Sequence, residues 1–289
     1  MINNMNKNMY KNEKGQTLLF VVVAMTIALA IGINASVRTV TSLSRTTRTD
    51  TSSRALSAAE GGIERFLSLS TQELENAMTG ACAAGTYDNS SGACKIEFDD
   101  VSDILVSQAF VTVERYAPAS YPFTLESGQV KEVNLYDFTN PGTFYSSNLI
   151  QICWTSRAQS DIMYLSYNSA GVQERGGITG DNPPGGLYVA QGFVPAGAGR
   201  DGYTNCEIVD IGVNIYGLRI RSVGGTSDVA IYGVGGAALP LQGYIITSVG
   251  TLQQDQSVTA SRTIRIIRTL PYLPVSFDYA LFSQSGIVK

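Results

Sequence analysis

The feature that most constrains this chain is an uncharged apolar run near its start. From Gln16 to Val37 the sequence reads QTLLFVVVAMTIALAIGINASV and holds no charged residue. A helix over these residues would be roughly 33 Å long, which matches the hydrocarbon core of a bilayer. A polar leader, residues 1–15, precedes it. We therefore predict a single transmembrane helix over residues 16–37 that tethers the rest of the chain.

The helical pattern does not stop at the predicted membrane edge. Residues 38–53 are rich in Thr and Ser, which form helices only moderately well, but they keep a narrow apolar stripe. Apolar side chains then recur on one face, at Leu56, Ala59, Ile63, Phe66, Leu67 and Leu74. We predict an amphipathic stalk over residues 38–80, with one helix running from Thr17 to Met78 and Gly61-Gly62 as a tolerated soft point.

Small residues recur every four positions within the apolar run. Ala24, Ala28, Gly32 and Ser36 would form one ridge along a helix. Such a ridge lets a second helix approach closely in lipid, where packing drives association. The alternative is that Ala and Gly are simply common in membrane helices.

The composition excludes several classes of function. The chain contains no histidine, so Ser-His-Asp and Cys-His catalytic sets and His-ligated metals are excluded. A carboxylate or Ser-Lys enzyme has no supporting motif, and we predict no enzymatic activity and no cofactor. A net charge of −4 with 15% charged residues also argues against nucleic-acid binding by charge alone.

Other local clusters favour structural roles. Asp99, Asp100 and Asp103 fit a solvated strand end better than a Ca²⁺ site, which needs six or more oxygen ligands. The glycine-rich stretch 175–186 lacks the Lys-Ser/Thr of a phosphate loop and is predicted to be a mobile surface loop. Trp154 lies in an apolar stretch and is predicted to pack in the core.

Four cysteines, none in a CxxC pair, indicate two disulfides in an oxidising compartment; four free thiols of a cytosolic protein are the alternative. Cys82 and Cys94 flank a Gly/Ser/Asn-rich loop suited to local closure. This favours Cys82–Cys94 and, by elimination, Cys153–Cys206.

The apolar period changes from 3.6 to 2 after Cys94, which predicts an antiparallel β-sandwich of jelly-roll type over residues 81–270 and hence an α+β chain. Residues 271–289 form a Pro- and aromatic-rich tail that could dock on the sandwich. The expected strands are 95–101, 109–116, 128–136, 148–156, 161–168, 186–194, 216–223, 227–234, 243–252 and 259–270.

Positive charge does not decide the orientation of the helix, because Lys precedes it and Arg follows it. The cysteines and the leader favour a cytoplasmic N-terminus in the inner membrane and an external domain. Ala28-Leu29-Ala30 could imitate a secretory cleavage site that would leave Ile31 at the N-terminus, but the apolar run continues past it.

Two stretches carry a resemblance to a known family. Lys14-Gly15, followed by Gln16-Thr17-Leu18-Leu19 and the apolar run, resembles a type IV prepilin signal. Residues 58–65, AAEGGIER, resemble the A-A-E-x-G-I-E-R stretch of PilX-like minor pilins and the GspK-like minor pseudopilin of type II secretion. The resemblance covers residues 11–70. It implies cleavage between Gly15 and Gln16 by a prepilin peptidase, and other pilins or pseudopilins as partners through the N-terminal helix.

One residue departs from the family pattern. Most pilins carry Glu as the fifth mature residue, where it pairs with the N-terminal amine of a neighbouring subunit, and this chain has Phe20 there. In the family this departure marks a minor subunit at the filament tip. An uncompensated amine in a bilayer is costly, which agrees with that placement. The resemblance implies a minor subunit supporting assembly, adhesion, DNA uptake or secretion, displayed on the cell surface. The alternative is a stand-alone membrane-anchored β-sandwich, and the external ligand is not identified.

Overall fold

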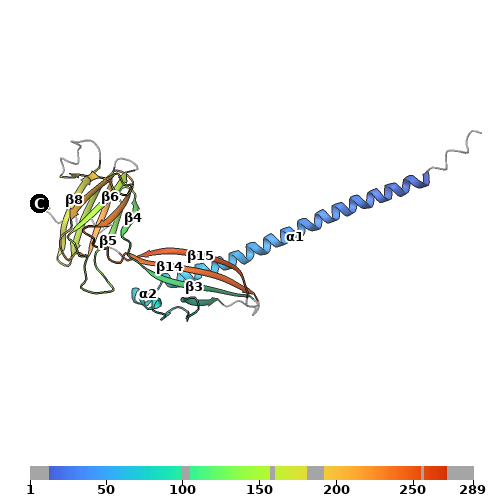
Figure 1. The fold of residues 1–289 in the computed structure, drawn as a ribbon, viewed down its shortest axis with the longest axis horizontal. Coiled ribbons are helices and arrows are strands. Elements are labelled where there is room, and N and C mark those ends of the chain that lie inside the picture. Colours follow the sequence, from blue (N-terminus) through green and yellow to red (C-terminus); the bar gives the residue numbers. More distant parts are fainter. Residues whose placement is uncertain (1–12, 99–104, 157–159, 181–191, 255–256, 272–289) are drawn as a thin grey trace, which may run out of the picture. The chain divides into compact units, whose positions relative to one another are not determined.

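The computed structural model describes residues 13–98, 105–156, 160–180, 192–254 and 257–271. The chain begins with a long helix, α1 (Glu13–Leu67), and a short helix, α2 (Thr71–Met78), follows it (Figure 1). The prediction of one helix from Thr17 to Met78 was therefore wrong at one place, residues 68–70. Gly61-Gly62, expected to be the soft point, lies inside α1 without interrupting it.

A capping box at Ser70 ends the predicted continuous helix. Ser70 has an extended backbone, with φ −69° and ψ 163°, so a helix cannot run through it. The Glu73 amide donates to the Ser70 hydroxyl at 3.3 Å, and the Ser70 amide donates to the Glu73 carboxylate at 2.7 Å. This reciprocal pair satisfies two backbone donors at the start of α2. Leu74, one turn later, is fully buried.

Within the described residues, the strands form three five-stranded sheets, with the orders β1-β2-β3-β14-β15, β10-β11-β6-β13-β4 and β5-β12-β7-β8-β9. Their bounds are β1 (Thr86–Asp88), β2 (Ala93–Phe98), β3 (Leu105–Tyr116), β4 (Ser120–Leu125), β5 (Val130–Asn134), β6 (Leu149–Ser156), β7 (Asp161–Asn168), β8 (Gly171–Thr179), β9 (Val194–Pro195), β10 (Gly197–Ala198), β11 (Asn205–Asp210), β12 (Gly217–Val223), β13 (Ser227–Gly233), β14 (Gly243–Gln254) and β15 (Ser257–Thr269).

The second and third sheets form a sandwich whose strand pairing is nested. Strand β4 pairs with β13, β5 with β12, β6 with β11 and β7 with β8, all antiparallel. The β6–β13 and β7–β12 pairs then complete the two sheets. A long hairpin rolled up in this way is a jelly roll, so the α+β class with a jelly-roll-like sandwich is confirmed.

The core of the sandwich lies between its two sheets. Ile152 and Trp154 of β6 and Ile231 of β13 come from one sheet, and Leu218 and Ile220 of β12 come from the other. All five side chains are completely buried. Trp154 is thus a core residue as predicted, and its indole Nε1 donates to the carbonyl of Ser160 at 3.2 Å. Successive side chains of a strand point to opposite faces, and here the intervening residues are buried as well: Cys153 of β6, Arg219 of β12 and Ala230 of β13.

The jelly roll is inserted into another sheet. Strands β3 and β14 are neighbours in the first sheet, and strands β4 to β13 all lie between them in the chain. The prediction that residues 81–270 form one sandwich was therefore wrong. At the exit of the insert, the Gln242 side chain donates to the Asn134 carbonyl at 2.8 Å and accepts from the Asn134 amide at 3.0 Å. The Gln242 amide donates to the Tyr116 carbonyl at 2.8 Å, which ties the end of β3 to the start of β14.

The chain divides into two compact units. One comprises Met1–Glu64, Lys95–Phe110 and Ser248–Ile264, and the other comprises Arg65–Cys94, Val111–Thr247 and Arg265–Lys289. The whole jelly roll lies in the second unit.

Sequence periodicity missed β1, β4, β8, β10 and β11. The predicted surface loop 175–186 was wrong over residues 175–179, which belong to β8. The reason lies in Gly176 and Gly177. A Cβ on Gly176 would lie 2.7 Å from the Tyr164 hydroxyl, and a Cβ on Gly177 would overlap the Phe193 ring. Glycine here makes room for aromatic rings rather than for a turn. The remainder of that loop, most of the expected strand 186–194 and the tail beyond Pro271 lie outside the described residues.

Candidate functional site

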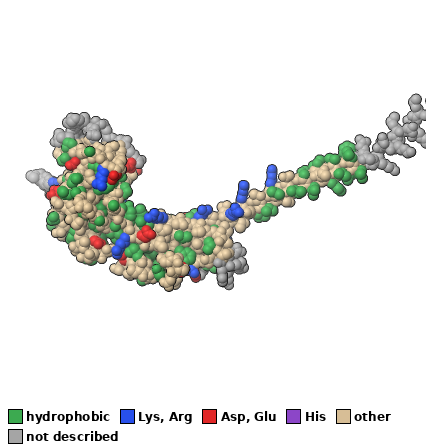
Figure 2. Space-filling view, viewed as in Figure 1, with side chains coloured by type: hydrophobic (Ala, Val, Ile, Leu, Met, Phe, Trp, Pro, Cys, Tyr) green, Lys and Arg blue, Asp and Glu red, His purple; other side chains and the backbone are tan. Residues whose placement is uncertain are grey.

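The N-terminal half of α1 is an exposed apolar rod. Every described side chain from Leu18 to Asp50 is exposed, and Leu18 and Phe20 are 71% and 66% accessible. Figure 2 shows hydrophobic side chains gathered along this half of the helix. Within the described residues, α1 is the one helix long and apolar enough to cross a membrane. An apolar surface of this extent requires an apolar environment or a partner.

Eight hydroxyl groups of α1 donate to a backbone carbonyl of the same helix. The Ser36 hydroxyl donates to the Gly32 carbonyl at 2.9 Å, and the Thr41 hydroxyl donates to the Val37 carbonyl at 2.8 Å. The same bond, to the carbonyl three or four residues earlier, is made by Thr26, Thr39, Thr46, Thr47, Thr49 and Thr51. Because these hydroxyls need no water, the Thr-rich segment suits an apolar or packed environment despite its composition.

The residues predicted from the apolar run all lie on this helix. Gly15 and Gln16 fall in its first turns. The predicted ridge of Ala24, Ala28, Gly32 and Ser36 is exposed along its length, and a Cβ placed on Gly32 would meet nothing within 4 Å. The ridge can therefore accept a second helix, and its packing role remains a prediction.

The helix becomes buried from Ala55 onward, within the first compact unit. Ala55 and Ala59 are fully buried, and they face Gly250 of β14. A Cβ on Gly250 would overlap the carbonyl oxygen of Ala55 and the amide nitrogen of Ala59. Leu56 and Leu67, which we expected on the buried face, are instead 40% and 42% exposed. The other members of the predicted face, Ala59, Ile63, Phe66 and Leu74, are buried as expected. Close backbone packing at Ala55 and Ala59 and the buried side chain of Ile63 hold the helix in this unit, and Leu56 does not.

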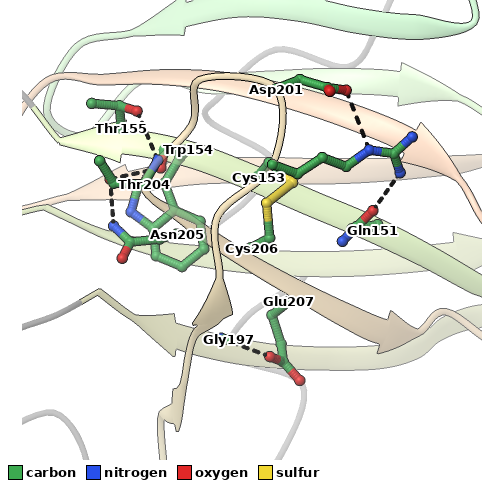
Figure 3. Close-up of a disulfide and its surroundings, with 11 residues drawn as sticks. Gln151, Cys153, Trp154, Thr155, Gly197, Asp201, Thr204, Asn205, Cys206 and Glu207 are labelled. Carbon is green, nitrogen blue, oxygen red and sulfur yellow. Dashed lines mark hydrogen bonds and ion pairs between the residues drawn. A yellow bond between two sulfur atoms is a disulfide. The ribbon is translucent and has the colours of Figure 1, made fainter.

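Both disulfides are present, with the predicted pairing: Cys82–Cys94 and Cys153–Cys206. Cys153 of β6 and Cys206 of β11 are register partners on adjacent strands, and Figure 3 shows their bond on the sheet beside Gln151 and Asp201. Arg200 lies over this region; its guanidinium donates to Gln151 at 2.8 Å, pairs with Asp201 at 3.2 Å and stacks 4.3 Å from the Tyr232 ring. The segment around Arg200 thus covers a buried crosslink, and the arrangement is structural.

A cavity of about 780 Å³ lies beside α2, in the second unit. At its wall, Arg115 of β3 pairs with the Glu75 carboxylate at 2.6 Å, and the Tyr244 hydroxyl donates to the same carboxylate at 2.7 Å. The hydrogen bond to Glu75 raises the pKa of Arg115, while burial and then the bond to Glu75 raise the pKa of Tyr244. The residues that line the cavity are Thr71, Gln72, Glu75, Asn76, Thr79, Arg115, Phe138, Thr139, Pro141, Leu270 and Pro271.

Sequence reasoning did not find this cavity, because its walls come from four separate stretches of chain. The capping box at Ser70 was the one local signal available, since Ser-x-x-Glu before an apolar residue marks a helix start. The exposed aromatic Phe138 gave no signal by periodicity, because it lies outside the strands.

Metal binding finds no support in the described part of the chain, where no group of three or more His, Cys, Asp or Glu side chains could hold an ion. The acidic cluster Asp99, Asp100 and Asp103 lies outside the described residues. No protein-family model, curated protein or solved structure matches this chain.

Proposed function

We propose that this protein is a structural subunit, a minor pilin or pseudopilin, of a type IV pilus or a type II secretion-like filament. The observation that carries the proposal is that the two halves of α1 differ in burial. Its described side chains up to Asp50 are exposed, with an apolar stretch as far as Val37 and a Thr-rich stretch beyond it. In contrast, Ala55 and Ala59 are packed on a sheet of the same chain. A helix of this kind can anchor in a membrane and later exchange lipid for neighbouring helices.

In this proposal a prepilin peptidase cleaves after Gly15, and the N-terminus lies on the cytoplasmic side of the inner membrane. The two disulfides support an external location for the β domain, because disulfides persist in oxidising compartments. The domain is displayed on the cell surface when the subunit enters a filament, where it supports assembly, adhesion, DNA uptake or secretion. Its role is structural rather than catalytic, in keeping with the absence of histidine.

Phe20 supports a position at or near the filament tip. Its ring is 66% exposed on α1, and it offers no carboxylate for the amine of a neighbouring subunit. Immunogold labelling of assembled filaments tests this position. We expect label at filament ends, and label along the whole shaft would contradict a tip subunit.

The second candidate is a membrane-anchored surface-binding protein that never enters a filament. The cavity beside α2 favours it, because a binding site needs no filament. Mass spectrometry of the mature N-terminus separates the two. A chain beginning at Gln16 supports the pilin proposal, an intact Met1 supports the plain anchor, and a chain beginning at Ile31 indicates secretion.

A cleavage-site variant sharpens this test. We expect Gly15→Leu to block processing and leave Met1 in place. Gly32→Ala is the matched control, because Gly32 is a glycine of the same helix where a Cβ meets nothing; it should be processed normally. Equal processing of both variants would contradict cleavage after Gly15.

A further inference from the structure

The filament role does not use the cavity beside α2. Its volume of about 780 Å³ falls within the range of small-molecule sites, about 300–1,000 Å³. Its walls are helix α2, Arg115 at the end of β3, the segment 138–141 and the Leu270-Pro271 pair, all within the second compact unit. The chemistry of these walls decides which ligand the cavity suits.

The polar part of the wall carries no net charge. Glu75 and Arg115 neutralise each other through their 2.6 Å ion pair. The other polar lining residues are uncharged hydroxyls and amides: Thr71, Gln72, Asn76, Thr79 and Thr139. Such groups can both donate and accept hydrogen bonds. An anionic ligand would meet no uncompensated cation in this wall, so an uncharged ligand rich in hydroxyls fits best.

Two amides of α2 are already oriented. The Gln72 side chain donates from Nε2 to Asn76 Oδ1 at 3.1 Å. This bond directs the remaining donor of Asn76, at Nδ2, and the remaining acceptor of Gln72, at Oε1. Each hydroxyl of a sugar ring can donate or accept a hydrogen bond. Two neighbouring hydroxyls can therefore bond to this donor and this acceptor, which are held on residues one helical turn apart.

The apolar part of the wall is an exposed aromatic ring on a fixed loop. Phe138 is 51% exposed, although aromatic rings usually dominate cores and interfaces. Its ring packs edge-on against Tyr136, with centroids 5.1 Å apart and an angle of 88° between the planes. Asp137 accepts from both the amide and the hydroxyl of Thr139, at 2.9 and 2.6 Å, which fixes the loop. Phe138 is thus a rigid apolar platform that needs no ordering on binding.

We propose that this cavity binds a neutral saccharide, whose apolar C–H face stacks on Phe138 and whose hydroxyls bond to the amides and hydroxyls of the wall. An extended peptide fits less well, because strand addition needs an open sheet edge and β3 is an interior strand of its sheet. The inference does not depend on filament assembly, so it can fail while the pilin proposal stands.

Saturation-transfer NMR on the full chain in nanodiscs tests the proposal, since sugar-based detergents would compete. The probes are lactose, maltose and cellobiose, with sialyllactose as a charged comparator and a Gly-Ser peptide as an uncharged one. We expect saturation of a neutral disaccharide. Phe138→Ala should weaken its binding about tenfold by removing the aromatic contact, and Phe138→Tyr, which keeps the ring, should bind within about threefold of the parent.

Two further variants distinguish the loss of a ligand contact from misfolding. Asn76→Ala, on exposed α2 surface, should also weaken binding, whereas Ile208→Ala, an exposed apolar residue outside the cavity, should not. Thermal unfolding checks each variant. Saturation of sialyllactose or the peptide alone, no saturation of any probe, or unchanged binding by Phe138→Ala would overturn the proposal. Fluorine NMR of a fluorinated Phe138 in the ligand-free protein adds a further check. If a soluble paramagnetic probe does not reach this ring, the chain itself fills the cavity and the proposal is overturned.

Discussion

Replacing Gly250 by alanine tests the way in which α1 joins its sheet. The new Cβ would overlap the Ala55 carbonyl and the Ala59 amide, which are backbone atoms that cannot rotate away. Overpacking costs about 1–3 kcal/mol in the free energy of unfolding. Because the atoms that would overlap here belong to rigid backbone, we expect a cost near the upper end, about 3 kcal/mol. The alanine itself recovers about 0.5–1 kcal/mol of this cost, because glycine loses more conformational entropy than alanine inside a strand. We expect a net loss of about 2 kcal/mol in the free energy of unfolding.

Thermal unfolding of the full chain measures this loss. A loss of about 2 kcal/mol corresponds to a Tm lower by about 4–8 °C for a domain of 150–250 residues. Hydrogen exchange over residues 55–63 adds a local readout, since α1 must separate from β14 and its amides should exchange faster. Gly32→Ala is the matched control, because it lies in the exposed half of α1 with nothing near its Cβ. A Gly250→Ala protein with unchanged Tm and unchanged exchange would refute the close approach.

Three further predictions concern the second unit. Replacing Cys153 and Cys206 together by serine should cost about 4 kcal/mol by the chain-entropy relation for a separation of 53 residues, measured by denaturant unfolding; a change below about 1 kcal/mol would contradict it. Ser70→Ala should cost about 1 kcal/mol by removing the capping box, with faster exchange confined to α2, and unchanged exchange there would count against it. Hydrogen bonds from Ser91 and then Ser90 lower the pKa of Asp88 to about 2. Because this folded-state pKa lies below the ordinary value of 3.8, the stability that these hydrogen bonds add to the folded state is present above pH 3.8 and is lost as the pH falls toward 2. An NMR titration checks this, and an Asp88 pKa near 3.8, or one that Ser91→Ala does not raise, would contradict it.

Local composition predicted the elements that need no distant partner. The apolar run of α1 could be predicted, because the absence of charge over a bilayer length is a property of consecutive residues. The Cys82–Cys94 pair was readable because a short polar loop closes easily. The break before α2 was equally readable from Ser70 and Glu73, but the continuing apolar period outweighed that signal in the prediction.

The errors arose where a residue serves a neighbour far away in sequence. Glycine at 176 and 177 indicated a loop, but in the structure it accommodates the rings of Tyr164 and Phe193. Leu56 was expected to be buried because it is apolar and in phase, yet the helix packs through Ala55 and Ala59, since only small residues allow the approach to Gly250. Neither outcome can be read from periodicity, which records the character of a residue and not the size of its partner.

The sequence by itself determined a bilayer-length helix, a strand-rich domain and two crosslinks, because these follow from consecutive apolar residues, period-two alternation and loop composition. Only the tertiary structure decided which strands pair. Thr124 of β4 meets Asp228 of β13 across 104 residues of chain, and the same nesting places the jelly roll between β3 and β14. The cavity beside α2 follows from that insertion, because its lining residues come from chain segments on both sides of the inserted strands as well as from the insert itself. Contacts of such long range depend on the packing of the whole core, which no local pattern encodes.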